Sequence, residues 1–258
     1  EEIIIPWAAR KLGCPVKWTE DRREHFLTTN TQRDSWWELE IAATSQGRVE
    51  GVRGHLITDT GAYVAYGVRL PATMMTPFPG PYKVRALDLT QNVVFTNTVS
   101  NSPVRGAGRP NAAYAMERVM VTVARELKID PAEVRLRNFV RREDFPYQTG
   151  LIHFDGRTIT YDSGDFHSLL EKALELADYA GFEDRKAAAR EEGRFLGIGM
   201  SSCIEDTGSG PYEGVTIRVD PRGQVQVTSG AASQGQGHQT ILQQIVADEL
   251  RVSLHDIH

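Results

Sequence analysis

The chain has 258 residues, which is enough for one large domain or two modest ones. Hydrophobic residues make up 40% of it and charged residues 24%, as in an ordinary globular protein. The formal net charge of -5 argues against a nucleic-acid partner or an anionic membrane bound by charge alone. No apolar run approaches the roughly 18 residues that span a bilayer.

The first third of the chain alternates helical and strand patterns. Gly13 followed by Pro15 is typical of a helix end, and Gly47 lies in a turn between two alternating apolar and polar runs. The stretch 73–82 is rich in Met, Pro and Gly and excludes a long regular element. The predicted elements are a helix over 1–12, a strand over 16–18, a hairpin of strands 36–44 and 49–58, and a strand over 87–96.

The longest helix is predicted to begin near Pro110 and to run to Leu127, with apolar residues at helical spacing. Asp130 is a candidate N-cap for a second helix that ends near Phe139. The polar stretch 141–163 is the predicted joint between two units.

The remainder of the chain has the same kind of pattern. The predicted elements are a helix capped by Asp165 and running to 176, a helix over 183–192, a strand over 195–203, a hairpin of strands 214–219 and 224–228, and a helix over 240–250. We therefore predict an α+β fold of two mixed α/β lobes with β-hairpins and packed helices, covering 1–145 and 146–258.

Two glycine-bearing loops precede helices and are candidate ligand sites. In the loop 229–240, glycines let backbone N–H groups approach a ligand, and the helix N-terminus favours an anionic group. Gln236 offers an amide donor and a carbonyl acceptor, and Thr240 can cap the helix or bond a phosphate. The alternative is a tight strand-to-helix connection whose glycines only satisfy backbone angles.

The second loop, 103–110, places Arg105 and Arg109 on either side of Gly-Ala-Gly. The arginines and the backbone donors could receive an oxyanion or a phosphate. The alternative is a solvated loop with surface arginines. The pattern excludes a nucleotide-hydrolase phosphate loop, because the Gly-Lys-Ser/Thr ending is missing, and it lacks the dinucleotide fingerprint.

Other polar residues show no spacing that indicates a site. Most histidines are scattered and are interpreted as structural or exposed, whereas His238 lies inside a glycine loop, where it could face a substrate. Glu205 and Asp206 are adjacent in the chain. Side chains of adjacent residues rarely face one another, so an acid/base pair is not expected there. Cys14 and Cys203 are interpreted as buried or incidental thiols in a reducing compartment.

Four separated motifs in one order resemble the molybdopterin-binding large subunit of molybdenum hydroxylases, the family of xanthine dehydrogenase, aldehyde oxidase and aerobic CO dehydrogenase. The motifs are Arg105-Gly-Ala-Gly-Arg-Pro110 with Ala115-Met-Glu-Arg118, Ile129-Asp-Pro-Ala-Glu-Val-Arg-Leu-Arg-Asn138, Tyr161-Asp-Ser-Gly-Asp-Phe166, and Gly235-Gln-Gly-His-Gln-Thr240 with Gln244-Ile-Val-Ala-Asp-Glu-Leu250. The resemblance runs essentially end to end, and it favours the ligand-binding interpretation of both loops.

The resemblance implies a bound molybdenum-pterin cofactor, either molybdopterin or its cytosine dinucleotide form. The implied cofactor-binding residues are Gln234, Gly235, Gln236, Gly237, Thr240, Arg105, Gly106, Ala107 and Gly108. Gln236 would lie near the metal's oxo ligand, and the two loops would converge on one cofactor. No protein side chain is expected to bind the metal, because the pterin dithiolene does so in the family.

The Arg-Gly-Ala-Gly-Arg sequence resembles the form II CO dehydrogenase-like large chains. Gly106 stands where the CO-oxidising form has a copper-binding cysteine, so the resemblance favours hydroxylation of an aldehyde, an N-heterocycle or a similar small substrate, with water as the oxygen source. The implied partners are an iron-sulfur subunit carrying 2Fe-2S, an FAD subunit and the remainder of the large subunit, in the cytoplasm.

We expect the chain to be an internal fragment, because both ends lie in patterned sequence. The two lobes would then be incomplete, the first at its N-terminal side and the second at its C-terminal side. The catalytic glutamate of the family, a general base, is expected beyond His258, so no catalytic residue is assigned within the chain. The alternative function is a catalytically silent scaffold or interaction fragment of the same fold.

Overall fold

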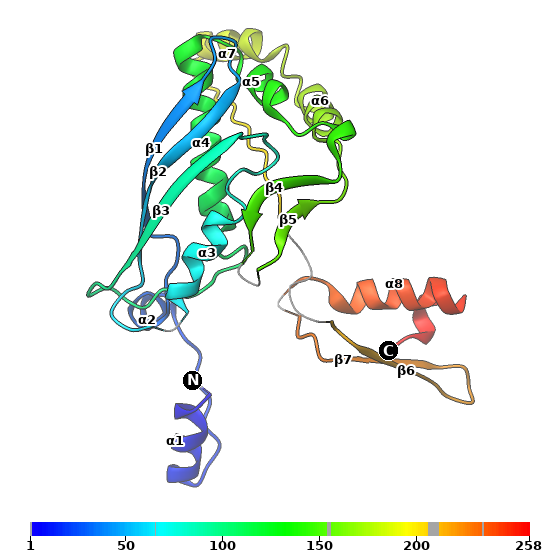
Figure 1. Ribbon diagram of the computed structural model, residues 1–258. Coiled ribbons are helices and arrows are strands. Elements are labelled where there is room, and N and C mark those ends of the chain that lie inside the picture. The colour runs from blue at the N-terminus through cyan, green and yellow to red at the C-terminus, as the bar shows by residue number, and fades with distance from the viewer. Residues whose placement is uncertain (1, 65, 154–155, 206–211, 234) are drawn as a thin grey trace. The chain divides into compact units, whose positions relative to one another are not determined.

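The computed structural model describes residues 2–64, 66–153, 156–205, 212–233 and 235–258, and the chain divides into two compact units, Glu1–Glu205 and Asp206–His258. Figure 1 follows each unit by colour along the chain. The helices are α1 (Ile4–Leu12), α2 (Arg22–Thr28), α3 (Leu70–Met75), α4 (Arg109–Leu127), α5 (Pro131–Asn138), α6 (Phe166–Leu176), α7 (Phe182–Glu191) and α8 (His238–Leu250). The strands are β1 (Ser35–Ala43), β2 (Val49–Asp59), β3 (Ala86–Val94), β4 (Tyr147–Ile152), β5 (Thr158–Tyr161), β6 (Val215–Val219) and β7 (Val225–Ser229). The predicted α+β class is confirmed.

The main sheet of the first unit has the strand order β1-β2-β3. The strands β1 and β2 form the predicted antiparallel hairpin, and β3 pairs with β2 in parallel, with Asp59 opposite Val94. Because parallel strands end at the same edge of a sheet, the segments that follow β2 and β3 leave the sheet together. The chain that follows β3 leads from this edge of the sheet to the loop 103–110.

The long helix α4 covers one face of this sheet, as Figure 1 shows. Its buried stripe repeats at helical spacing and packs against Val49, Val52, Phe78 and Tyr82. The stripe consists of Ala112, Ala115, Met116, Val119, Met120, Val123 and Ala124. The predicted start near Pro110 is confirmed, since α4 begins at Arg109 and Pro110 lies in its first turn.

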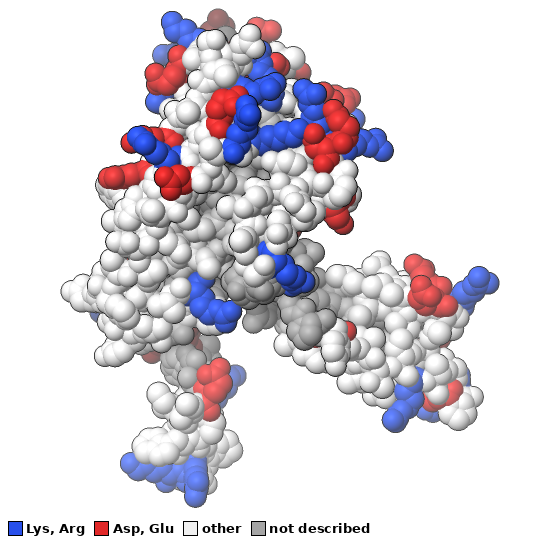
Figure 2. Space-filling view, viewed as in Figure 1, with Lys and Arg blue, Asp and Glu red and all other residues white. Residues whose placement is uncertain are grey.

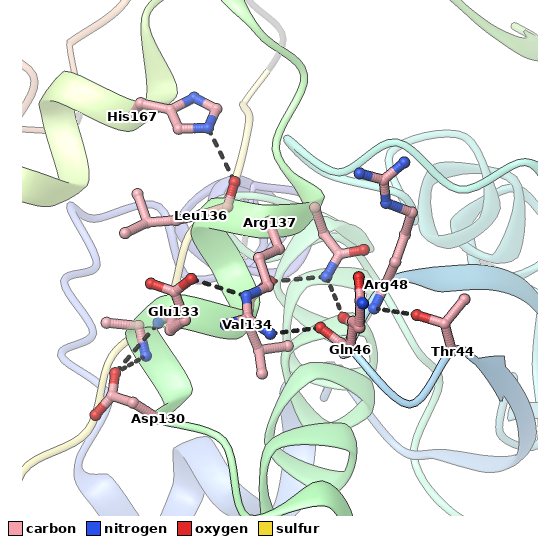
Figure 3. A network of polar contacts seen from close by, with 12 residues as sticks. Thr44, Gln46, Arg48, Asp130, Glu133, Val134, Leu136, Arg137 and His167 are labelled. Atoms are coloured by element: carbon pink, nitrogen blue, oxygen red, sulfur yellow. Dashed lines mark hydrogen bonds and ion pairs between the residues drawn. The ribbon is translucent and has the colours of Figure 1, made fainter.

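Polar contacts tie α5 to the turn between β1 and β2 (Figure 3). The Arg137 guanidinium donates to the Gln46 carbonyl (2.6 Å) and pairs with Glu133 (2.8 Å). Behind it, the buried Asn138 side chain accepts from the Val49 N–H and donates to the Gly47 carbonyl, each at 2.8 Å. These bonds satisfy backbone groups that the turn leaves without strand partners.

A buried ionic cluster joins α4, α5 and the chain after α7. The fully buried Arg135 donates through Nε to Glu117 Oε2 (2.9 Å) and through Nη2 to the Met200 carbonyl (3.2 Å). The Tyr82 hydroxyl donates to the other Glu117 oxygen. Burial, together with the adjacent Glu117 carboxylate, raises the pKa of Tyr82 far above its ordinary value, so the phenol stays protonated.

Two predicted strands are wrong. Residues 16–18 and 195–203 run without a strand partner, so neither forms the predicted strand. The polar stretch 141–163, predicted as the joint between two units, contains the antiparallel pair of β4 and β5. The division between lobes at 145 and 146 stays a prediction.

The second unit is small. Its antiparallel hairpin of β6 and β7 packs with α8 around four buried residues, Val225, Val246, Ala247 and Ile257. The hairpin was predicted at 214–219 and 224–228 and is confirmed, while α8 begins at His238, two residues before the predicted start. Among the described residues, no helix combines the length and the apolar composition needed to cross a membrane.

Charged side chains of both signs are interspersed over the end of the first unit that carries α5, α6 and α7 (Figure 2). Several are paired within one helix, at positions three or four residues apart. The pairs are Glu133 with Arg137 (2.8 Å), Lys172 with Glu175 (2.7 Å) and Lys186 with Glu183 (3.1 Å). Charge along these helices is therefore locally compensated.

Candidate functional site

The loop 103–110 forms a tight turn that leads directly into α4. Gly106 and Ala107 both have positive φ, 94° and 48°. The Ala107 N–H donates to the Val104 carbonyl (2.7 Å), and the Arg109 N–H donates to the Gly106 carbonyl (3.0 Å). Gly108 occupies the N-cap position of α4. The loop therefore has a defined shape that its own backbone bonds help to maintain.

Two neighbouring side chains from the segment before β1 hold the outer carbonyls of this loop. The Gln32 amide donates to the Ala107 carbonyl (2.6 Å) and accepts from the Val104 N–H. The Arg33 guanidinium donates to the Ala107 carbonyl (3.1 Å) and to the Arg105 carbonyl (2.9 Å). We call this pair the Gln32–Arg33 clamp. Sequence reasoning missed it, because a polar pair before a strand carries no signal of a contact more than 70 residues away.

The inner side of the loop rests on α3. The Gly108 N–H donates to the Thr73 hydroxyl (2.9 Å), which in turn donates to the Leu70 carbonyl (2.7 Å). A Cβ added at Gly108 would lie 2.5 Å from Met74 Cγ and 2.7 Å from the Met74 backbone nitrogen. Only glycine permits this approach, so the side chain of any other residue would push the loop away from α3.

These bonds leave two successive amides of the loop available. Within the described residues, the N–H groups of Arg105 and Gly106 make no hydrogen bond, whereas those of Ala107 and Gly108 are used internally. Successive amides in a turn of this kind can bind an anion. The Arg105 side chain is exposed, and the half-buried Arg109 pairs with Glu205 at 3.5 Å. Of the predicted residues, Arg105 and Gly106 thus have the backbone donors suited to a ligand.

The segment that leads into this loop is anchored at the end of β2. The Asp59 carboxylate accepts from the Gly61 N–H (2.7 Å) and from the hydroxyls of Thr96 (2.8 Å) and Thr98 (2.7 Å). Burial acts to raise the pKa of the Asp59 carboxyl, but these donors outweigh it and hold the pKa below its ordinary value. The ionised carboxylate thereby fastens the chain between β3 and the loop.

The second candidate loop lies between β7 and α8, in the second unit. Gly235 and Gly237 have positive φ, 102° and 77°, and Gly237 is the N-cap of α8, so Thr240 does not cap this helix. The added Cβ of either glycine would meet no atom of the described residues within 4 Å. Gln236 and Thr240 are exposed, and Gln234 lies outside the described residues.

The N-terminus of α8 offers further donors. The helix has 13 residues, and the Ile241 N–H makes its first bond, to the Gly237 carbonyl (3.0 Å). The N–H groups of a first turn have no partner in the helix and favour an anion. The adjacent His238 Nδ1 is buried and has no hydrogen-bond partner within the described part of the chain. The loop thus combines glycines with free space around them, a helix N-terminus, and a ring nitrogen without a hydrogen-bond partner among the described residues.

Other candidates have structural partners. His25 pairs with Glu20 (2.9 Å), His55 with the Thr90 hydroxyl (2.9 Å) and His167 with the Leu136 carbonyl (2.9 Å). Cys14 and Cys203 are both exposed, so of the two interpretations, buried or incidental thiols, the first is wrong. In the ranges that the structure describes, no three side chains of His, Cys, Asp or Glu gather closely enough to hold a metal ion.

Comparisons with known proteins agree with one another. Sequence profiles of the molybdopterin cofactor-binding domain match residues 1–139 and 172–258. The gamma subunit of the 6-hydroxypseudooxynicotine dehydrogenase complex of Paenarthrobacter nicotinovorans is 35% identical over 100% of this chain and 32% of its own length. The carbon monoxide dehydrogenase large chain of Hydrogenophaga pseudoflava is 35% identical over 93% of this chain and 32% of its own.

A solved structure shows the same relationship. Quinoline 2-oxidoreductase from Pseudomonas putida 86 superposes with a TM-score of 0.86 at 34% identity, covering 99% of this chain and 34% of that one. This chain therefore spans about a third of the length of the proteins that it matches.

Proposed function

Because the chain belongs to the molybdopterin cofactor-binding domain family, we propose that it forms walls of the molybdenum-pterin site in the large subunit of a molybdenum hydroxylase. The resemblance inferred from the motifs is confirmed, since both matching profiles describe a molybdopterin cofactor-binding domain and a carbon monoxide dehydrogenase large chain is among the relatives. The observation that carries the proposal is the loop 103–110, whose carbonyls are occupied while the amides of Arg105 and Gly106 are available.

The residues present fit an anionic pterin group. Hydrogen-bond donors suited to phosphate and oxo groups are present at the available amides of Arg105 and Gly106 and at the N-terminus of α8. Gly235 and Gly237 leave space for such a group to approach the backbone. The buried His238 Nδ1 has no hydrogen-bond partner among the described residues, which supports a polar ligand group at the second loop.

The two loops are proposed to bind one cofactor. Arg105, Gly106, Ala107 and Gly108 would line one side, and Gly235, Gln236, Gly237 and Thr240, with Gln234, the other. Gln236 would contact the metal end of the group through its side-chain amide. When bound, the cofactor supplies the redox centre that takes two electrons from the substrate, with water as the oxygen source. This chain's residues would bind and orient it and exclude bulk water.

The proposed substrate class is an aldehyde or an N-heterocycle. Relatives named for quinoline and for a nicotine derivative favour a heterocycle. The glycine at position 106 has no thiol to hold copper, and the chain's two cysteines lie at positions 14 and 203. This argues against CO oxidation, although a CO dehydrogenase large chain is among the relatives.

The proposed assembly follows the relatives, which carry subunit names. The partners would be an iron-sulfur subunit with 2Fe-2S, an FAD subunit and further parts of the large subunit, all in the cytoplasm. The pterin would be molybdopterin or its cytosine dinucleotide form. The general base would be a glutamate outside residues 1–258.

The test is cofactor analysis of the complete protein that carries residues 1–258, purified with its co-expressed subunits. We expect stoichiometric molybdenum and a pterin that fluoresces after oxidative release. Gln236→Ala should lower turnover of an N-heterocycle while leaving the melting temperature within a few degrees. Gln239→Ala is the matched control, because this glutamine is exposed three residues further along the chain, in the first turn of α8. A purified protein without molybdenum and pterin would instead support the catalytically silent scaffold.

A further inference from the structure

The Gln32–Arg33 clamp reaches the candidate loop only through backbone atoms. Gln32 uses both ends of its amide, donating to the Ala107 carbonyl (2.6 Å) and accepting from the Val104 N–H. Arg33 uses two guanidinium nitrogens, one for the Ala107 carbonyl (3.1 Å) and one for the Arg105 carbonyl (2.9 Å). The contacts are independent of the side chains that the loop itself carries.

Because a peptide unit is planar, a hydrogen bond that fixes its carbonyl also fixes the direction of its N–H. In a trans peptide unit the C=O and the following N–H point in opposite directions. The Arg105 carbonyl and the Gly106 N–H share one such unit, so the bond from Arg33 turns the Gly106 N–H away from the clamp. The Arg105 N–H shares its peptide unit with the Val104 carbonyl, which accepts from the Ala107 N–H (2.7 Å), so the Arg105 N–H points away from the Ala107 N–H.

The clamp has its own anchor, separate from the loop. Arg33 has a positive φ of 83°, which is unusual for a residue with a side chain. The Asn111 amide on α4 donates to the Arg33 carbonyl (3.3 Å) and to the Ser35 hydroxyl (2.9 Å). The helix that follows the loop thus also holds the clamp in place.

Building on the proposed function, we propose that Gln32 and Arg33 are positioning residues that aim the Arg105 and Gly106 amides at an anionic acceptor of the pterin cofactor. Arg33 acts through the planar, two-pronged geometry of its guanidinium. A lysine retains the charge but is a single-point donor, so it cannot hold the Arg105 and Ala107 carbonyls in one fixed arrangement.

The experiment compares Arg33→Lys and Gln32→Met with wild type in the complete, cofactor-loaded protein. We expect both variants to hold molybdenum and pterin about 10- to 100-fold less tightly during dialysis. The electron paramagnetic resonance signal of the remaining molybdenum should also change. Cofactor-free protein should melt within about 4 °C of wild type. Arg85→Lys is the matched control, since Arg85 is exposed and pairs only with Glu50 (3.2 Å) among the described residues.

A second measurement needs no variant. Residue-resolved hydrogen exchange should show that the Arg105 and Gly106 amides are protected with the cofactor bound and exchange faster by at least tenfold once it is removed. The Ala107 and Gly108 amides should stay protected in both forms, because the Val104 carbonyl and the Thr73 hydroxyl hold them.

The outcomes separate the two proposals. A wild-type protein without molybdenum and pterin refutes the proposed function and the clamp together. A loaded wild type whose Arg33→Lys variant keeps the same cofactor content and the same resonance signal refutes the clamp alone. Equal exchange of the Arg105 and Gly106 amides with and without cofactor also refutes it, even where a variant fails to fold.

Discussion

The buried Arg135 gives the sharpest prediction about stability. Its side chain is 0% exposed and that of its partner Glu117 is 8% exposed. Arg135→Met removes both donors to Glu117 Oε2 and leaves the buried carboxylate with the Tyr82 hydroxyl. Removing one member of a buried ion pair costs about 3–5 kcal/mol. At about 1.4 kcal/mol for each factor of ten, the folding equilibrium constant of the first unit should fall by two to four powers of ten.

The assay is urea denaturation of the cofactor-free protein, followed by hydrogen exchange of the α4 and α5 amides to localise the effect. Glu117→Gln combined with Arg135→Met should unfold at a higher urea concentration than Arg135→Met alone, because the uncompensated charge is gone. A loss below about 1 kcal/mol for Arg135→Met, or a double variant weaker than the single one, would show that the pair does not behave as a buried salt bridge.

Three further changes have defined outcomes. Asn138→Ala should lower the free energy of unfolding by about 2–4 kcal/mol in denaturant titrations, because it leaves buried backbone groups of the β1–β2 turn without hydrogen-bond partners. A change near zero would mean that water replaces the amide. Thr73→Val should loosen the Gly108 end of the loop and speed cofactor loss in dialysis, while Thr90→Val on the sheet surface should not. The lowered pKa of Asp59 contributes stability that is complete above the ordinary carboxyl pKa of about 3.9 and disappears as the pH falls through the lowered value. Asp59→Asn should therefore flatten the acid side of the melting-temperature profile, and an unchanged profile would contradict this.

Local signals predicted most of the regular elements. Asp130 and Asp165 are found as N-caps: Asp130 accepts from two backbone N–H groups of the helix that follows, and Asp165 accepts from one. Gly13 ends α1 in the left-handed conformation. These features depend on a few adjacent residues, so they can be inferred from the chain alone. The two predicted hairpins, β1 with β2 and β6 with β7, follow the same logic.

Features that depend on distant partners were missed. Residues 195–203 have strand-like composition, yet Met200 contributes its carbonyl to Arg135 and not to a strand ladder. A sequence reports the propensity of a segment but not whether a neighbouring strand exists to pair with it. The Gln32–Arg33 clamp was not predicted for the same reason, because its contacts join residues 72 to 75 positions apart.

The candidate site was predictable as two loops but not as an arrangement of donors. The glycines and the following helices marked the loops, whereas the hydrogen bonds of the folded chain decide which amides are occupied and which are available. Since the two loops belong to different units, their convergence on one cofactor stays a prediction.

The contact between Gly108 and α3 limits how this loop could be redesigned for new substrates. A library of variants that changes the exposed side chain at Arg105 alters the surface of the turn without touching the backbone that Thr73 holds. The same library extended to position 108 would force a side chain into the Met74 backbone and displace the whole turn. Diversity in a selection experiment therefore belongs at 105, with 108 left as glycine.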